Sequence, residues 1–263
     1  MNSRRTSRIK PPLLIVGVLA SAIPALAASF QENFDGVAPP ALPAGWTATA
    51  ASNGVVWQTN GFVSDTAPNS VGVAVPAAVA DQSLYSPPIV LSNTSGTITL
   101  TFRHKFAFDK SNNGANDGGR LEISISGVRQ GAFQDIIDAG GTFVTGGYTD
   151  PISSTTNPLY GEAAMLWSGF LYDSFMTTTV ELPASAAGST IQLRWRMVSD
   201  DSVSTLGWKV DSIKLCDPGD TTSNICPSDC NGGACGTSGM SAMAVSLAGL
   251  ISARRVRRRR SVR

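Results

Sequence analysis

The stretch TLTFRHKFAF, residues 99–108, alternates between two kinds of side chain over ten positions. Its even positions carry Leu, Phe, His, Phe and Phe, whereas its odd positions carry Thr, Thr, Arg, Lys and Ala. A period of two places successive side chains on opposite faces of a β-strand. The stretch therefore predicts a strand with one largely apolar face and one polar face.

The rest of the chain up to about residue 216 repeats this pattern, with Gly- and Pro-rich turns between the strands and weak helical periodicity. Strands of this kind pack as two antiparallel sheets face to face. We therefore expect residues 29–216 to form an all-β antiparallel β-sandwich, a jelly roll. The side chains expected to point into it are Phe102, Phe106, Ile123, Leu193 and Trp195, and those expected to point outward are Arg103, Lys105, Glu122 and Arg194.

The last predicted strand, WKVDSIKL at 208–215, contains an irregularity. Its apolar positions are 208 and 210, followed by 213 and 215, so the alternation shifts by one residue at Asp211 and Ser212. One extra residue is typical of a β-bulge, which can redirect a side chain. A simple strand end would also account for the shift.

Composition and charge restrict the class of protein. The 263-residue chain is 42% hydrophobic, 15% charged and contains 26 Gly, which favours a β-rich fold with many turns. Four basic residues lie in the first ten positions and seven Arg in the last ten. The remaining nine Lys and Arg face all 19 Asp and Glu, a net charge of −10. Such a region is not expected to bind nucleic acid, and its unpaired carboxylates favour bound metal ions.

Both ends of the chain have the patterns of targeting segments. Basic residues, a short apolar run that ends in ALAA at 25–28, and small residues at −3 and −1 predict a signal peptide over residues 1–28. Residues 217–239 form a Gly-, Ser- and Cys-rich linker in this interpretation, and 240–263 combine an apolar stretch with the Arg cluster. That apolar stretch is shorter than an ordinary membrane-spanning helix.

All four cysteines lie near the end of the chain. In an exported protein they are disulfide candidates, and the sequence does not choose among their three pairings. No His lies near them, so zinc is not expected. The four are Cys216, Cys226, Cys230 and Cys235.

The sequence contains few of the residues that most enzymes use. His104 is its one histidine and lies on the apolar face of the 99–108 strand, so a buried, hydrogen-bonded side chain is expected. Phosphate-binding and dinucleotide-binding motifs are absent from the sequence. A pair of carboxylates acting on a sugar stays open as an alternative.

One loop has the pattern of a cation site. The stretch DKSNNGANDGG at 109–119 places oxygen-bearing side chains, including Asp109 and Asp117, at alternate positions before glycines. Such side chains can converge on calcium. Position twelve is Arg120 rather than Glu, however, and a polar hairpin loop explains the composition equally well.

An ordered set of short motifs resembles the MAM-like and cleaved-adhesin jelly-roll modules of secreted bacterial proteins. The motifs are ENFDG at 32–36, LPAGW at 42–46, Trp57, LYSPPI at 84–89, FRH at 102–104, DGGRLEIS at 117–124 and WKVDSI at 208–213. The resemblance implies a structural calcium held by Glu32 and Asp211, with Asp35 as a further candidate. It also implies an accessory binding or adhesion role without catalysis, directed at an extracellular glycan or protein.

The C-terminal segment resembles the sorting tails of bacterial envelope proteins, of the PEP-CTERM and Myxo-CTERM types. That resemblance implies sorting or processing machinery at the membrane as a partner, and anchoring at the cell envelope or outer surface. Four aromatic residues are candidates for a ligand platform, although a core position is the expected alternative for each Trp; they are Trp46, Trp57, Trp167 and Tyr172. We thus expect an exported, envelope-tethered binding module, with a carbohydrate-active enzyme or a purely structural surface protein as the alternatives.

Overall fold

The computed structural model describes residues 29–52 and 55–226. The predicted signal peptide, the C-terminal apolar stretch and the Arg cluster lie outside the described residues. Nearly all of the regular structure is β, and every ladder between named strands is antiparallel. No helix within 29–52 and 55–226 is long and apolar enough to cross a membrane.

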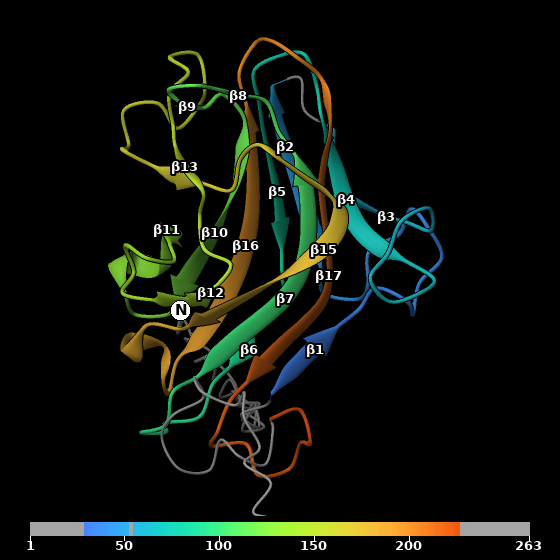
Figure 1. The fold of residues 1–263 in the computed structure, drawn as a ribbon. Coiled ribbons are helices and arrows are strands. Elements are labelled where there is room, and N and C mark those ends of the chain that lie inside the picture. The colour runs from blue at the N-terminus through green and yellow to red at the C-terminus, as the bar shows by residue number, and fades with distance from the viewer. Residues whose placement is uncertain (1–28, 53–54, 227–263) are drawn as a thin grey trace, which may run out of the picture.

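Two sheets make up the sandwich (Figure 1). The seven-stranded sheet has the order β12-β15-β7-β17-β4-β3, with β1 also paired to β17. Its strands are β1 (Phe30–Glu32), β3 (Gln58–Asn60), β4 (Ser70–Val75), β7 (Thr99–Ala107), β12 (Thr142–Thr145), β15 (Phe170–Glu181) and β17 (Thr205–Cys216). The prediction of an antiparallel β-sandwich of the jelly-roll type is confirmed.

The six-stranded sheet has the order β11-β10-β16-β5-β2, with β6 also paired to β16. Its strands are β2 (Thr47–Ser52), β5 (Ala80–Tyr85), β6 (Ile89–Val90), β10 (Gly118–Ile125), β11 (Gln134–Asp135) and β16 (Thr190–Ser199). The short hairpins β8 (Lys110–Ser111) with β9 (Gly114–Ala115) and β13 (Asp150–Pro151) with β14 (Met165–Leu166) complete the strands, and η1 (Arg129–Gly131) and η2 (Ala184–Ala186) are 3-10 turns. In Figure 1, β8, β9 and β13 gather at the end of the sandwich opposite β1 and β6.

The core lies between the sheets and is dominated by aromatic rings. Trp195 and Phe102 meet edge to face at 5.7 Å, and Trp167 meets Phe102 in the same way at 5.8 Å. All five side chains predicted to point inward are buried. Edge-to-face packing of this kind adds to the free energy of burial, so this cluster stabilises the contact between the two layers.

The side chains predicted to point outward from the sheets are not all exposed to water. Glu122 and Arg194 point away from the core, but Glu122 is fully buried and Lys105 is only 8% exposed. Residues from elsewhere in the chain cover these outer faces: Phe133 lies over Arg194, and the rings of β15 lie over Lys105. A period of two gives the face of the sheet on which a side chain lies, but not whether that face meets water.

The predicted bulge in the last strand is confirmed. The register of β17 against β7 shifts between Asp211 and Lys214, and Ser212 adopts a φ of 49°. A left-handed backbone is uncommon for a residue with a side chain and occurs where surrounding contacts hold it. The bulge directs Asp211 toward the loop that precedes β4, where its carboxylate accepts backbone hydrogen bonds from Asp65 and Thr66.

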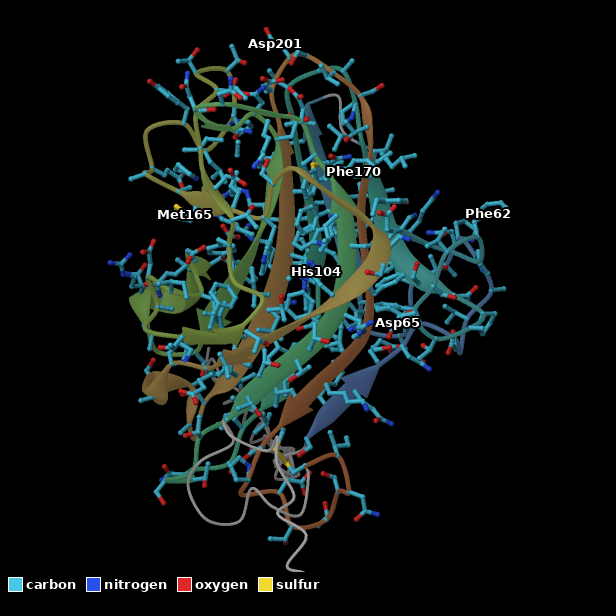
Figure 2. All side chains as sticks on the ribbon, in the orientation of Figure 1. Phe62, Asp65, His104, Met165, Phe170 and Asp201 are labelled. Atoms are coloured by element: carbon cyan, nitrogen blue, oxygen red, sulfur yellow. A yellow bond between two sulfur atoms is a disulfide. The ribbon has the colours of Figure 1, made fainter. Side chains whose placement is uncertain are left out.

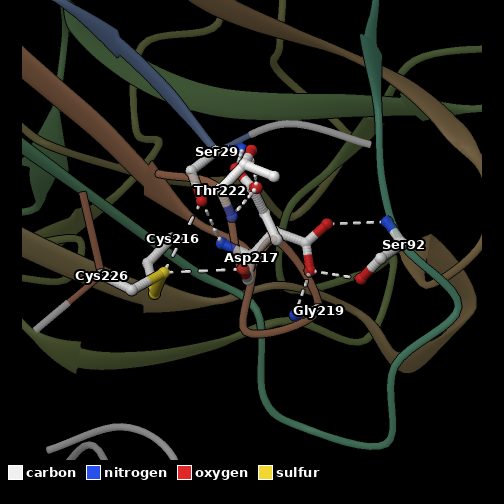
Figure 3. Close-up of a disulfide and its surroundings, with 8 residues drawn as sticks. Ser29, Ser92, Cys216, Asp217, Gly219, Thr222 and Cys226 are labelled. Atoms are coloured by element: carbon white, nitrogen blue, oxygen red, sulfur yellow. Dashed lines mark hydrogen bonds between the residues drawn. A yellow bond between two sulfur atoms is a disulfide. The ribbon is translucent and has the colours of Figure 1, made fainter. Parts of the chain in front are cut away.

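The base of the sandwich closes through a disulfide and two buried acids (Figure 3). Cys216 and Cys226 form the disulfide, and Asp217 accepts hydrogen bonds from the backbone and hydroxyl of Ser92. Asp220 accepts a hydrogen bond from the backbone of Ser29. Residues 217–226, the first part of the segment interpreted as a linker, thus pack against the sandwich.

Candidate functional site

The outer face of the seven-stranded sheet carries a groove of about 510 Å³. It runs over β3, β4 and β17 toward the middle of β15. This volume falls in the range of known ligand sites. We call it the sheet-face groove, and its lining residues are Val55, Val56, Gln58, Asn60, Phe62, Val63, Gly72, Val73, Ala74, Tyr172, Leu206 and Lys209.

Apolar side chains are unusually exposed around this groove. Phe62 is 96% exposed, and Leu206 is 57% exposed. Figure 2 shows Phe62 on the loop beside β3 and β4, pointing away from the sandwich. Phe170 is 72% exposed and its ring lies 6.2 Å from that of Tyr172. Contiguous exposed apolar surface of this kind marks interaction sites in soluble proteins.

A long irregularity in β15 shapes one end of the sheet-face groove. Leu171 pairs with Phe106 and Met176 pairs with His104, so residues 172–175 lie opposite Lys105 alone. The Lys105 ammonium lies 4.4 Å from the centre of the Tyr172 ring and 5.3 Å from that of Phe175. The extra residues let both rings contact the lysine, which is a cation–π arrangement.

The two carboxylates of the first predicted calcium pair accept hydrogen bonds from different backbone groups. Glu32 lies opposite Ile213 in the ladder between β1 and β17, and its carboxylate accepts the backbone N–H of Phe34. Asp211 is fully buried, and its oxygens accept the N–H groups of Asp65, Thr66 and Ser212. Burial raises the pKa of Asp211, and these donors act in the opposite direction.

The neighbours of this pair also argue against a cation there. Asp65 binds the Arg103 guanidinium at 2.9 Å, so a fixed positive charge already lies at this edge. Asp35 accepts hydrogen bonds from Asn33 and from the backbone of Asn69. The residues at Glu32, Asp35 and Asp211 therefore do not fit a ready-made calcium site, because donors already occupy both oxygens of Asp211.

The second predicted site fits better. Asp117 is fully buried, and its Oδ1 accepts the backbone N–H of Asp200 at 2.9 Å. Its Oδ2 is buried without a hydrogen-bond partner among the described residues. Burial raises the pKa of Asp117 to about 7, and the carboxylates of Asp200 and Asp109 contribute in the same direction. A buried, unpartnered carboxylate oxygen calls for a proton or a cation.

Asp109 is the second carboxylate predicted for this site. Asp109 accepts a hydrogen bond from Asn116 at 2.8 Å, which holds the two ends of the 109–117 loop together. Across 29–52 and 55–226, no three His, Cys, Asp or Glu side chains gather closely enough to hold a metal on their own. A calcium ion here would therefore also need amide or backbone oxygens, which calcium accepts readily.

The predicted aromatic platform is mostly core. Trp46, Trp57 and Trp167 are 5%, 1% and 0% exposed, so they are not available to stack on a ligand. Of the four candidates, Tyr172 alone lines the sheet-face groove. Sequence reasoning did not single out Phe62, Phe170 and Leu206. Phe62, at the tip of the Gly- and Ser-containing loop at 61–64, was the one detectable signal, since a loop rarely buries a large apolar side chain.

His104 has the structural role that was predicted for it. It is fully buried near the middle of the sandwich (Figure 2), and its Nδ1 accepts the indole N–H of Trp208 at 3.1 Å. Its Nε2 therefore carries the proton and donates to Thr178 at 2.8 Å. Burial, and then the nearby Arg103, lower the pKa of His104 to about 3, so the side chain is neutral in the folded protein.

The cysteine prediction is resolved for one pair. Cys216 and Cys226 are joined, with their Cα atoms 4.9 Å apart. Cys230 and Cys235 lie outside the described residues. The bridge ties the end of β17 to the segment that packs beneath β1.

No protein-family model and no curated protein matches this sequence. Two solved structures that it resembles are cleaved adhesin domains of Lys-gingipain from Porphyromonas gingivalis. One is 14% identical, covers 72% of this chain and 98% of its own, and has a TM-score of 0.40. The other is 18% identical, covers 72% and 99%, and has a TM-score of 0.43.

A third similar structure is the CBM22-1 xylan-binding domain of Xyn10C from Paenibacillus barcinonensis. It is 10% identical, covers 72% of this chain and 94% of its own, and has a TM-score of 0.38. All three likenesses are too distant to establish a family.

Proposed function

We propose that this chain is an exported, non-catalytic binding module whose sheet-face groove holds an extracellular glycan. The observation that carries the proposal is the exposed apolar and aromatic lining of a ligand-sized groove on one sheet. Phe62 and Tyr172 supply flat aromatic faces and Leu206 an aliphatic contact, whereas Gln58 and Asn60 supply amide donors and acceptors. A sugar ring needs both, because it presents C–H faces and hydroxyl edges.

The groove lacks the groups that a glycoside hydrolase needs. Hydrolysis of a glycosidic bond uses two carboxylates on either side of the bond. Among the described residues that line the groove, there is no Asp, Glu or His. This composition favours binding over the enzyme alternative.

Export and tethering are further parts of the proposal. The predicted signal peptide and sorting tail support passage to the cell envelope, and the Cys216–Cys226 disulfide is typical of an oxidising compartment. Intact-mass measurement on protein from the native host should find that the mature form lacks residues 1–28, and that the tail has been processed. A mature protein that retains both Met1 and Arg263 would contradict this part.

We also propose a calcium ion at the 109–117 loop, held through Asp117 and Asp109. The buried, unpartnered Oδ2 of Asp117 supports it. Bound there, calcium would supply positive charge and fix the loop, with no role in a reaction.

The binding proposal is tested with a panel of extracellular polysaccharides and the full chain. Phe62→Ala should weaken binding about tenfold, since exposed aromatic anchors dominate interface energies. Tyr160→Ala is the matched control, because Tyr160 is 54% exposed but lies outside the groove lining. Equal loss in both variants, or no binding to any polysaccharide, would contradict the proposal. Release of reducing sugars would instead establish the enzyme alternative.

A further inference from the structure

Two lysines lie directly opposite each other on the outer face of the seven-stranded sheet. Lys105 on β7 and Lys209 on β17 are cross-strand partners in the ladder that joins these strands. Like charges at directly opposed positions repel each other and destabilise a sheet. The pairing therefore lowers stability where the chain could have carried any polar residue.

The described surroundings do not neutralise either ammonium group. Within residues 29–52 and 55–226, no carboxylate forms an ion pair with Lys105 or Lys209. Arg103, two residues before Lys105 on the same face, is by contrast paired with Asp65. Burial, followed by the charge of Lys105, lowers the pKa of Lys209. Charges removed from water without a partner carry a free-energy cost.

Both lysines are held in place by specific features. The bulge of β15 places the rings of Tyr172 and Phe175 against Lys105. Lys209 lies across Gly72, its partner on β4, where a Cβ atom would stand only 2.7 Å from the Lys209 ammonium. A side chain at position 72 would displace that ammonium. The glycine thus keeps the Lys209 charge close to the sheet, at the edge of the groove.

We propose that Lys105 and Lys209 form an anion-recognition site at the β15 end of the sheet-face groove, so that the glycan it binds carries carboxylate or sulfate groups. Lys209, which lines the groove, would donate a charge-assisted hydrogen bond to the anion. The buried charge of Lys105 behind it would add attraction, and the anion would offset the repulsion between the two lysines. Tyr172, which contacts Lys105 and lines the groove, would pack against the sugar ring that bears the anion. This inference rests on the proposed function, and no acidic side chain among the described lining residues would repel such a ligand.

The experiment compares ligands that differ in charge alone. Polygalacturonate is titrated against its fully methyl-esterified form, and dextran sulfate against dextran, with the full chain. The charged member of at least one pair should bind more tightly, and that binding should weaken with added salt. The pair that shows the preference distinguishes carboxylate from sulfate. If neutral and charged members bind equally, the anion inference is overturned while the proposed function stands.

Variants of Lys209 place the effect in the groove. Lys209→Gln should weaken binding of the charged polymer about tenfold, since it removes one charge-assisted hydrogen bond. Lys209→Arg keeps the charge and should retain most of the binding, which separates a charge effect from misfolding. Lys214→Gln on the exposed side of the same strand is the matched control. The arginines at 254–263 are common to all variants, so a preference for charge that survives Lys209→Gln would overturn the inference.

Discussion

The outer faces of the two sheets differ in whether their most buried charged side chains have a partner of opposite charge. On the six-stranded sheet, Glu122 contacts three arginines, one on its own strand and two on β16. On the seven-stranded sheet, Lys105 and Lys209 face each other without an acidic partner among the described residues. The three arginines of the first face are Arg120, Arg194 and Arg196.

Coverage by other segments explains the difference. Asp81 binds Arg196 at 2.6 Å, Glu162 binds Arg120 at 3.0 Å, and Phe133 lies 4.4 Å from the Arg194 guanidinium. The charges on this face balance one another beneath a layer of chain. On the seven-stranded sheet, the rings of Tyr172 and Phe175 cover Lys105, whereas Lys209 lines the open sheet-face groove without an acidic partner among the described residues. Among the described residues, the buried charges on the six-stranded sheet are thus paired, whereas the two opposed lysines beside the candidate site have no acidic partner.

The largest expected effect is on the paired face. Glu122→Gln should lower the free energy of unfolding by about 3–5 kcal/mol, because it leaves buried guanidinium groups without their shared carboxylate. Urea denaturation measures this change. Glu162→Gln is the control: its side chain is 50% exposed, and the expected loss is below about 1 kcal/mol. Equal losses would show that the network is not centred on Glu122.

His104, in the core between the two sheets, should make the free energy of unfolding depend on pH. The pKa of His104 is lowered to about 3 in the folded protein, whereas an unfolded His has a pKa of about 6.5. Between pH 6.5 and about 3, the unfolded state therefore binds a proton on His104 that the folded state does not. The contribution of neutral, buried His104 to the free energy of unfolding is complete above pH 6.5 and falls by about 1.4 kcal/mol per pH unit below it.

Urea denaturation of wild type and His104→Gln at several pH values below 6.5 isolates this contribution. Asp117 has a raised pKa and gives the opposite trend, but it does so equally in both proteins. The difference in stability between the two proteins should narrow as the pH falls. A constant difference would mean that His104 is not kept neutral by burial.

A smaller effect on stability is expected from calcium at Asp117, whose carboxylate has a buried oxygen without a partner among the described residues. Calcium that binds only the folded state, with a dissociation constant of about 10⁻³ M, adds about 1.4 kcal/mol to the free energy of unfolding at roughly ten times that concentration. The melting temperature should therefore be higher in calcium than in chelator, and Asp117→Asn should abolish the difference. Glu32→Gln should leave the difference unchanged. An identical melting temperature in both buffers would refute the site.

The smallest expected change in stability is at Lys209 in the sheet-face groove, and its sign is opposite to that of Glu122→Gln. Lys209→Gln should raise the free energy of unfolding by about 0.5 kcal/mol, because it removes the repulsion from Lys105. Lys214→Gln should change it little. The same substitution that weakens binding of a charged glycan would thus stabilise the protein, as expected for a residue kept for function. A loss of several kcal/mol would show instead that Lys209 has a structural partner.

Local sequence was sufficient for several features of the fold and for little of the site. Alternation identified β7, β10 and β16, and the phase shift at Asp211 identified the bulge. Glu32 and Asp211 were brought to the same edge by the pairing of β1 with β17, yet backbone donors rather than a neighbouring acid satisfy Asp211.

The sequence by itself determined the strands, the inward faces and the neutral, buried position of His104, because each depends on neighbours one or two positions away. Tertiary structure alone decided which outward faces are covered. Lys105 and Glu122 occupy equivalent outward positions in the alternation, yet Glu122 lies beneath paired arginines and Lys105 beneath the bulge of β15. A period of two specifies only the face of the sheet on which a side chain lies. Segments that are far away in the chain decide whether a charge on that face meets water, a partner or an open groove. Those contacts cannot be deduced from the neighbouring residues in the sequence.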